Sequence, residues 1–307
     1  MNTLSNAMPD SPLESRGIAS STMSATRPLY WSIRRELWEN RFIYIAPLAV
    51  AGVVLFASSI SAILGIWESE LRIHSAHGAE AIVMPYDMAA GLMMLTSILV
   101  SVFYCLDALH GERRDRSILF WKSLPVSDLT TVLAKASIPL VVLPLLVFAI
   151  IVAVHWLMLL VSSAVLLVSG QSVAAFWAKL SFFRMSLLML YHLLTAHALW
   201  PFPVYCWLLL VSGWARRATF LWAALPLIAI AGVEQIVFHT WHFARLVGSR
   251  LIGDTETIAA GGMFPTGPMT HITPGIFLTS PGLWIGFAIA AAFLAAAVRL
   301  RRYQGPI

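Results

Sequence analysis

The chain has 307 residues, of which 59% are hydrophobic and only 11% are charged, far below the roughly 25% charged residues of soluble domains. This composition excludes an ordinary soluble protein and predicts an all-α, polytopic integral membrane protein surrounded by lipid. The net charge of +5 does not indicate nucleic-acid binding, because the basic residues stand in short clusters beside long apolar runs, where they act as topology signals.

The first part of the chain, residues 1–26, is rich in Ser, Met, Pro and Thr. It has no apolar run of the kind that a signal peptide needs, and its composition predicts a disordered tail. Met23 begins a stretch that resembles a natural start, so either Met1 or Met23 can be the first residue. We expect residues 27–307 to form one membrane domain.

A short amphipathic helix is predicted directly before the first apolar run. Tyr30, Ile33 and Leu37 share one helical face by their spacing, and charged residues cover the other faces, at Arg34, Arg35, Glu36 and Glu39. Such a helix is typical of the membrane interface. A simple topogenic flank explains the same residues equally well.

Six apolar runs are long enough to cross a bilayer, which takes about 20 residues in a helix. They lie near 42–66, 87–109, 136–160, 183–211, 218–239 and 280–299. The third run continues beyond one span, and Pro139 and Pro144 favour a kink near its start. In the sixth run, Gly282, Gly286 and Ala290 form a small-residue face, which we expect to make an intramolecular contact rather than a dimer seam.

Basic residues indicate the orientation of these spans. With six spans, both termini lie on one side, and most Lys and Arg residues fall on that side, at Arg27, Arg34, Arg35, Arg41, Arg113, Arg114, Arg116, Lys122, Lys135, Arg216, Arg217, Arg299, Arg301 and Arg302. The opposite side has Arg72, Lys179, Arg184, Arg245 and Arg250. The positive-inside rule therefore predicts that both termini are cytoplasmic.

The loop between the second and third spans contains the most informative residues. Four large apolar residues stand between charged residues, namely Ile118, Leu119, Phe120 and Trp121. Exposed apolar patches of this size usually mark contacts with a partner, although a helix lying on the membrane surface explains them equally well. Pro125 then ends the helix, and Ser127 or Asp128 can cap the next one.

In this loop the chain resembles the permease subunits of ABC-2 type transporters. The matching residues are Glu112, Arg113, Ser117, Leu119, Leu124, Pro125, Val126, Ser127 and Lys135. The chain departs from the family's Gly-containing form of this motif at Arg114, Asp115, Arg116 and Trp121. The resemblance implies a cytoplasmic coupling helix, with an ATPase-coupling interface formed by Glu112, Arg113, Ser117, Ile118, Leu119, Phe120, Trp121, Lys122, Leu124 and Pro125.

The resemblance also implies the partners of the chain. It implies a bacterial inner-membrane exporter in which two copies, or this chain and a similar one, form the pathway. The chain contains no phosphate loop of the form G-x-x-x-x-G-K-[ST], so we expect ATP and Mg²⁺ to bind to a separate P-loop ATPase subunit. We expect no cofactor on this chain, and the cargo is not indicated.

Ionisable residues within the spans are the remaining candidates for function. Glu234 can line a pathway or, as we favour, pair with Arg184, whereas Asp107 is expected to reach interfacial water or a basic loop residue. His155, His192 and His197 suggest a metal site or an intramembrane enzyme. The five-residue spacing of His192 and His197 does not place both on one helical face, so we expect no metal site.

Two alternatives to a permease remain at this point. An intramembrane enzyme requires polar side chains that converge within the bilayer. A non-transporting membrane scaffold requires only that the loop from Ile118 to Trp121 binds some other protein.

Overall fold

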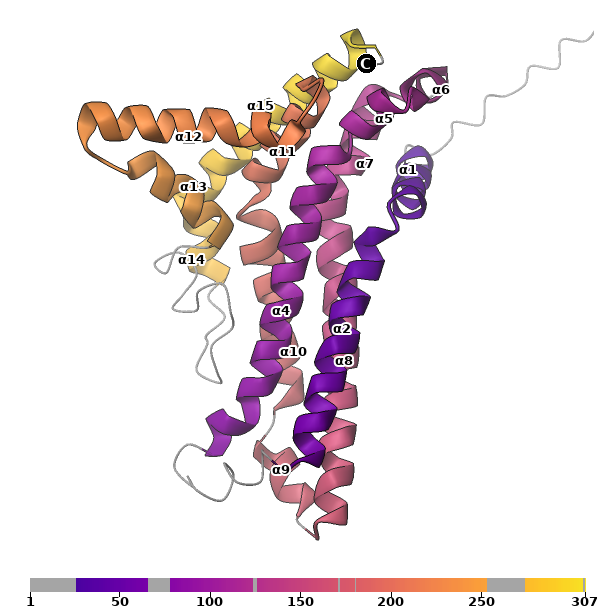
Figure 1. Cartoon of the computed structure of the whole chain (residues 1–307), viewed down its shortest axis with the longest axis vertical. Helices are drawn as coiled ribbons and strands as arrows, with labels where there is room; N and C mark the ends of the chain where they lie inside the picture. The colour runs from indigo at the N-terminus through magenta and orange to yellow at the C-terminus, as the bar shows by residue number, and fades with distance from the viewer. Residues whose placement is uncertain are drawn as a thin grey trace, which may run out of the picture.

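The computed structural model describes residues 26–65, 78–123, 126–170, 172–179, 181–252, 274–305 and 307. Within these ranges every regular element is a helix, which confirms the predicted all-α class (Figure 1). Except for Thr26, the predicted tail 1–26 lies outside the described residues, as do both candidate start methionines. The elements are α1 (Thr26–Glu39), α2 (Phe42–Ile63), α4 (Gly78–Asp107), α5 (His110–Arg114), α6 (Ser117–Ser123), α7 (Asp128–Ser137), η1 (Ile138–Val142), α8 (Leu143–Val168), α9 (Val173–Lys179), α10 (Phe182–His192), η2 (Leu193–Leu199), α11 (Phe202–Trp214), α12 (Thr219–Phe238), α13 (His242–Ile252), α14 (Pro274–Thr279) and α15 (Pro281–Tyr303).

Six helical runs in the described part of the chain are long and apolar enough to cross a membrane, as predicted. They are Phe42–Ile63, Val83–Arg114, Asp128–Val168, Phe182–Leu199, Thr219–Phe238 and Pro281–Tyr303. The protein is therefore a multi-pass membrane protein by helix length and composition.

The third run is one helix whose pitch changes near the predicted kink. Between α7 and α8, the five residues of η1 form a π-helical turn, in which the amide of Leu143 donates to the carbonyl of Ile138. Pro139 lies inside this turn and has no amide hydrogen to give, so the wider turn replaces the α-helical pattern. The helix continues through Val168 without ending.

The fourth run is interrupted where the sequence has Pro201. Helix α10 passes into η2, and after Trp200 and Pro201 the chain begins α11. Because Pro201 lacks an amide hydrogen, the carbonyl of His197 accepts a bond from the Tyr205 hydroxyl instead, at 3.0 Å. The carbonyl of Trp200 accepts a hydrogen bond from Nη1 of Arg250, on α13, at 3.5 Å.

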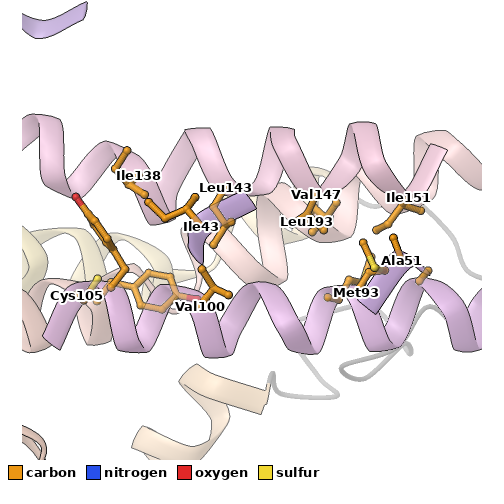
Figure 2. Packing of buried hydrophobic residues seen from close by; sticks show 14 of the residues in the cluster. Ile43, Ala51, Met93, Val100, Cys105, Ile138, Leu143, Val147, Ile151 and Leu193 are labelled. Atoms are coloured by element: carbon orange, nitrogen blue, oxygen red, sulfur yellow. The ribbon is translucent and has the colours of Figure 1, made fainter. Parts of the chain in front are cut away.

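The core lies where α2, α4, α8 and η2 meet. Figure 2 shows side chains from α4 facing side chains from η1 and α8 within the cluster of buried apolar residues. Since these side chains are buried, dispersion and close packing hold them together. The labelled residues are Ile43, Ala51, Met93, Val100, Cys105, Ile138, Leu143, Val147, Ile151 and Leu193.

Helix α12 is packed differently from the other predicted spans. It lies across the long axis of the bundle (Figure 1), and Ala223 is its only buried residue. The chain then returns along α13 and α14 to the start of α15. Its length agrees with the fifth predicted span, but the bundle does not enclose it.

The small-residue face of α15 packs within the molecule, as expected. Gly282 lies against the Trp200 ring, and Ala290 is fully buried. A β-carbon at Gly286 would stand 2.8 Å from Nη1 of Arg250 and 3.1 Å from Cγ of Pro203. The Nη2 atom of Arg250 also donates to the Gly282 carbonyl, at 2.6 Å.

We expect Gly286→Ala to destabilise the protein by about 1–3 kcal/mol, because the added methyl group displaces Arg250 and presses on Pro203. Thermal unfolding of the detergent-purified protein measures this change. Gly52→Ala is the matched control, since nothing lies within 4 Å of its β-carbon position and alanine favours the helix. Equal unfolding temperatures for the two variants would contradict the packing described here.

Candidate functional site

The segment of α5 and α6 lies at one end of the bundle, together with α1 and the last residues of the chain (Figure 1). Its backbone is tied to α11, where the Ser212 hydroxyl accepts bonds from the amides of Leu109 and His110, both at 2.9 Å. The amide of Ile307 donates to the Arg113 carbonyl at 3.2 Å. The loop predicted from the sequence is therefore attached to the bundle on two sides.

Glu112 is the centre of a buried group of charges. Its Oε1 atom accepts from Nη2 of Arg35 at 2.8 Å and lies 3.1 Å from Nζ of Lys135. Its Oε2 atom accepts from Nη1 of Arg301. Only 6% of the Glu112 side chain and 2% of the Lys135 side chain are exposed. All three cations thus meet one carboxylate.

A second buried carboxylate, Glu36, completes this group. Its Oε1 atom accepts from Lys135 and from Arg35, both at 2.8 Å. Its Oε2 atom accepts from the Tyr104 hydroxyl at 2.8 Å. We call the set the buried ion network; its members are Arg35, Glu36, Tyr104, Glu112, Asp128, Lys135 and Arg301.

The buried ion network balances its charges and joins five helices. Asp128 contributes the third carboxylate, 3.2 Å from Nε of Arg301. Partial burial lowers the pKa of Arg35, but Glu36 and Glu112 outweigh this effect and raise its pKa above the ordinary value. Three cations and three carboxylates therefore connect α1, α5, α7 and α15, and Tyr104 adds α4.

Helix α6 presents fewer apolar residues to the outside than the sequence predicts. Leu119 and Phe120 are 59% and 60% exposed, but Ile118 is buried. The Trp121 ring lies under Arg35, with the guanidinium carbon 3.8 Å from the ring centre. The prediction that all four residues are exposed is wrong for Ile118. A helix that lies against the bundle turns about one residue of every turn inward, and in α6 this residue is Ile118.

The remaining polar residues of the loop make local contacts. Nζ of Lys122 donates to the carbonyls of Gln304 and Arg302, at 3.0 and 3.4 Å. The Ser117 hydroxyl donates to the Glu112 carbonyl at 3.4 Å. Ser127 caps α7 by accepting from the Thr130 amide, as predicted. Leu124 and Pro125 lie outside the described residues.

Arg116 has a backbone conformation that suits glycine. It connects α5 to α6 with a φ of 57°, in the left-handed region that costs an L-residue roughly 1–2 kcal/mol. Arg116 is also one of the residues at which the chain departs from the Gly-containing motif. The turn is formed all the same, so its strain is carried by the surrounding contacts.

Helix α1 is rotated relative to the prediction. Ile33 and Leu37, expected at the membrane interface, pack against the core instead. The exposed aromatic residues of α1 are Tyr30, Trp31 and Trp38. This orientation follows from the buried ion network, because Arg35 and Glu36 must face the bundle to reach Glu112 and Lys135.

The expected pair of Glu234 with Arg184 is not among the ion pairs of the described residues. Glu234 accepts instead from the Thr240 hydroxyl and the amides of His242 and Phe243, all at 2.8 Å. It thus caps the start of α13, where free amides attract a carboxylate.

Arg184 and Asp107 both have exposed side chains. Arg184 lies on α10. Asp107 pairs with the loop residue Arg114 at 3.7 Å, which confirms the expected contact with a basic loop residue.

The three histidines are placed separately. Nε2 of His155 lies 3.1 Å from the Tyr86 carbonyl, and Nδ1 of His192 lies 2.9 Å from the carbonyl of Leu188 on its own helix. The carbonyl of His197 bonds to Tyr205, as described above. In the described ranges, no three His, Cys, Asp or Glu residues are grouped so that they could hold a metal ion.

No protein-family model matches this chain, and no curated protein or solved structure is similar to it. The likeness to ABC-2 permeases therefore rests on the loop residues and the pattern of spans alone.

Sequence reasoning missed Arg35, Glu36, Tyr104, Asp128 and Arg301 as members of the site. One signal was present: Lys135 stands at the edge of a long apolar run, where an ammonium group needs a carboxylate partner. The sequence does not tell which carboxylate, because Glu36 is 99 positions away.

We expect Glu112→Gln to destabilise the protein by about 3–5 kcal/mol, because Arg35, Lys135 and Arg301 would then be balanced by Glu36 and Asp128 alone, which leaves one positive charge of the network uncompensated. Chemical or thermal unfolding of the purified protein measures the loss. Asp115→Asn is the matched control: among the described residues, Asp115 pairs with the exposed Arg114 alone, and such pairs contribute about 1 kcal/mol at most. A Glu112→Gln effect as small as that of the control would show that the network does not support the fold.

We expect Arg116→Gly to stabilise the protein by about 1 kcal/mol, because glycine adopts positive φ without a steric cost. Arg116→Ala removes the same charge but keeps the steric conflict, so it should not give this gain. The comparison uses the unfolding temperatures of the two variants. Equal gains would assign the effect to charge rather than to backbone conformation.

Proposed function

We propose that this chain is the membrane-spanning permease subunit of an ABC-2 type exporter in a bacterial inner membrane. In this proposal α6 is the coupling helix, and α1, the α5–α6 segment and the chain's last residues lie in the cytoplasm. The distribution of basic residues over the loops supports that orientation.

The observation that carries the proposal is the contrast between the two sides of the loop. Leu119 and Phe120 face outward at the end of the bundle, where a partner can hold them. Behind them, Glu112 is bound to Lys135 of α7 and to Arg301 of α15. A displacement of α6 would therefore be transmitted to α7 and α15 through buried ionic contacts. Such contacts deform less than a surface loop does.

The energy source in this proposal is a separate P-loop ATPase, which binds ATP and Mg²⁺ itself. Two permease copies, or this chain and a similar one, would complete the pathway, because six spans form half of the usual arrangement in the family. The closing of two ATPase subunits around ATP would move both coupling helices.

In this proposal, the side of α1 that faces away from the bundle would lie at the lipid interface. Trp31 and Trp38 are exposed, and the guanidinium carbon of Arg34 lies 5.2 Å from the centre of the Trp31 ring. Tryptophan and arginine are typical of the interface, where one part of each side chain is apolar and the other is hydrated or ionic. The amphipathic character predicted for this segment is then supplied by residues other than Ile33 and Leu37.

The test is co-purification of the tagged chain from native membranes. We expect a P-loop ATPase to accompany the natural chain, and we expect Leu119→Asp to abolish this association, because it places a charge in an apolar contact. Leu129→Asp is the matched control, since Leu129 is also an exposed leucine, 54% accessible, but lies on α7. Both variants should purify in the same amount and elute at the same volume.

Three results would count against a permease. The natural chain would come without an ATPase, Leu119→Asp would retain it, or Leu129→Asp would lose it to the same extent. Recovery of a different partner through Leu119 would instead favour the membrane scaffold.

A further inference from the structure

A pocket of about 510 Å³ opens at the same end of the molecule as α6. It is formed where α5, the end of α11 and the last residues of the chain meet. Its lining residues are Arg113, Trp214, Arg216, Gln304, Gly305 and Ile307. This volume is in the range of small-ligand sites in proteins.

Arg113 holds a buried positive charge at the wall of this pocket. Only 7% of its side chain is exposed. Its Nη1 atom donates to the Gly213 carbonyl at 2.5 Å, and its Nε atom donates to the Gly305 carbonyl at 3.3 Å. These acceptors fix the guanidinium group, but they are neutral carbonyls at a helix end, which offset only part of a unit charge.

Arg216 adds a second positive charge to the same pocket. The ion pairs of the described residues involve neither Arg113 nor Arg216. Two guanidinium groups, those of Arg113 and Arg216, thus line one pocket. Holding like charges together costs free energy that a bound anion would recover.

We propose that this pocket binds a phosphate group, presented either by an anionic lipid headgroup or by a small soluble phosphate. Guanidinium groups match the paired oxygens of phosphate, with two parallel hydrogen bonds. The amide of Gln304 offers further donors, and the Trp214 ring gives an apolar wall for a glycerol or acyl segment. Basic pockets between membrane helices on the cytoplasmic side are typical sites for anionic headgroups.

A ligand in this pocket would link the α5–α6 segment to α11 and to the residues after α15. Arg113 directly follows Glu112 of the buried ion network, so the ligand would stabilise the position of the loop. This inference goes beyond the proposed function and does not depend on it, because it concerns binding that can be measured without transport or an ATPase.

The experiment uses the full chain, purified in detergent and titrated with dioleoyl-phosphatidylglycerol or dioleoyl-phosphatidylcholine. Native mass spectrometry counts the bound lipid. We expect the anionic lipid to bind more tightly, and we expect Arg216→Gln to weaken it roughly tenfold, the effect of losing one charge-assisted hydrogen bond. Arg217→Gln is the matched control, because Arg217 is the exposed neighbour and does not line the pocket.

A second variant gives an independent result if Arg216→Gln does not fold. Gln304→Glu adds a carboxylate to the pocket and should also weaken binding of phosphatidylglycerol. Glycerol 3-phosphate and inorganic phosphate are titrated separately. Binding of either one that depends on Arg216 identifies a soluble phosphate as the ligand, whereas binding of the lipid alone identifies the headgroup.

Two outcomes would overturn the proposal. In the first, phosphatidylglycerol binds no better than phosphatidylcholine, and neither soluble phosphate binds. In the second, Arg217→Gln weakens binding as much as Arg216→Gln, which would assign the preference to general surface charge.

Discussion

The burial of Lys135 is the constraint on which the end of the bundle that carries α1, α5 and α6 depends. An ammonium group without a partner costs several kcal/mol in a protein interior, and Lys135 is only 2% exposed. Glu36 and Glu112 meet this need from two segments that are remote in sequence. The second carboxylate oxygen of Glu36 then accepts from the Tyr104 hydroxyl, and that of Glu112 accepts from Arg301. One buried cation thus determines where α1, α5 and α15 lie around α7, and it does so by orientation-dependent contacts that apolar packing alone does not supply.

Two sides of the loop segment, one facing α7 and the other facing α11, are held by different kinds of contact. Toward α7, the attachment is ionic and centres on Glu112. Toward α11, it is made by backbone groups: Ser212 accepts two amides, and Arg113 reaches the carbonyls at the helix end. Beyond these attachments, in α6, Leu119 and Phe120 are the apolar residues that remain well exposed. The segment is therefore fixed at its base and open at its tip, and the pocket lined by Arg113 and Arg216 lies on its α11 side.

Hydropathy predicted the spans because lipid demands long apolar helices whatever they pack against. Local chemistry likewise predicted the Ser127 cap and the disturbance near Pro139. Helical periodicity assigned Ile33 and Leu37 to one face of α1, but it does not say which face meets the protein. The answer came from Glu36, whose partner Lys135 is distant in sequence. The crosswise position of α12 depends on tertiary contacts that a single sequence does not reveal.

The π-helical turn η1 sets the phase between the two halves of the third run. Residues of an α-helix follow one another by about 100°, so an uninterrupted helix would turn Leu143, Val147 and Ile151 well away from the direction of Lys135. A π turn takes up one extra residue, and this brings the apolar face of α8 into line with the ionic face of α7. Losing one residue within η1 would restore an ordinary helix with both faces still aligned. At this point of the protein, chain length is thus freer to vary than it is in α7 or α8 themselves.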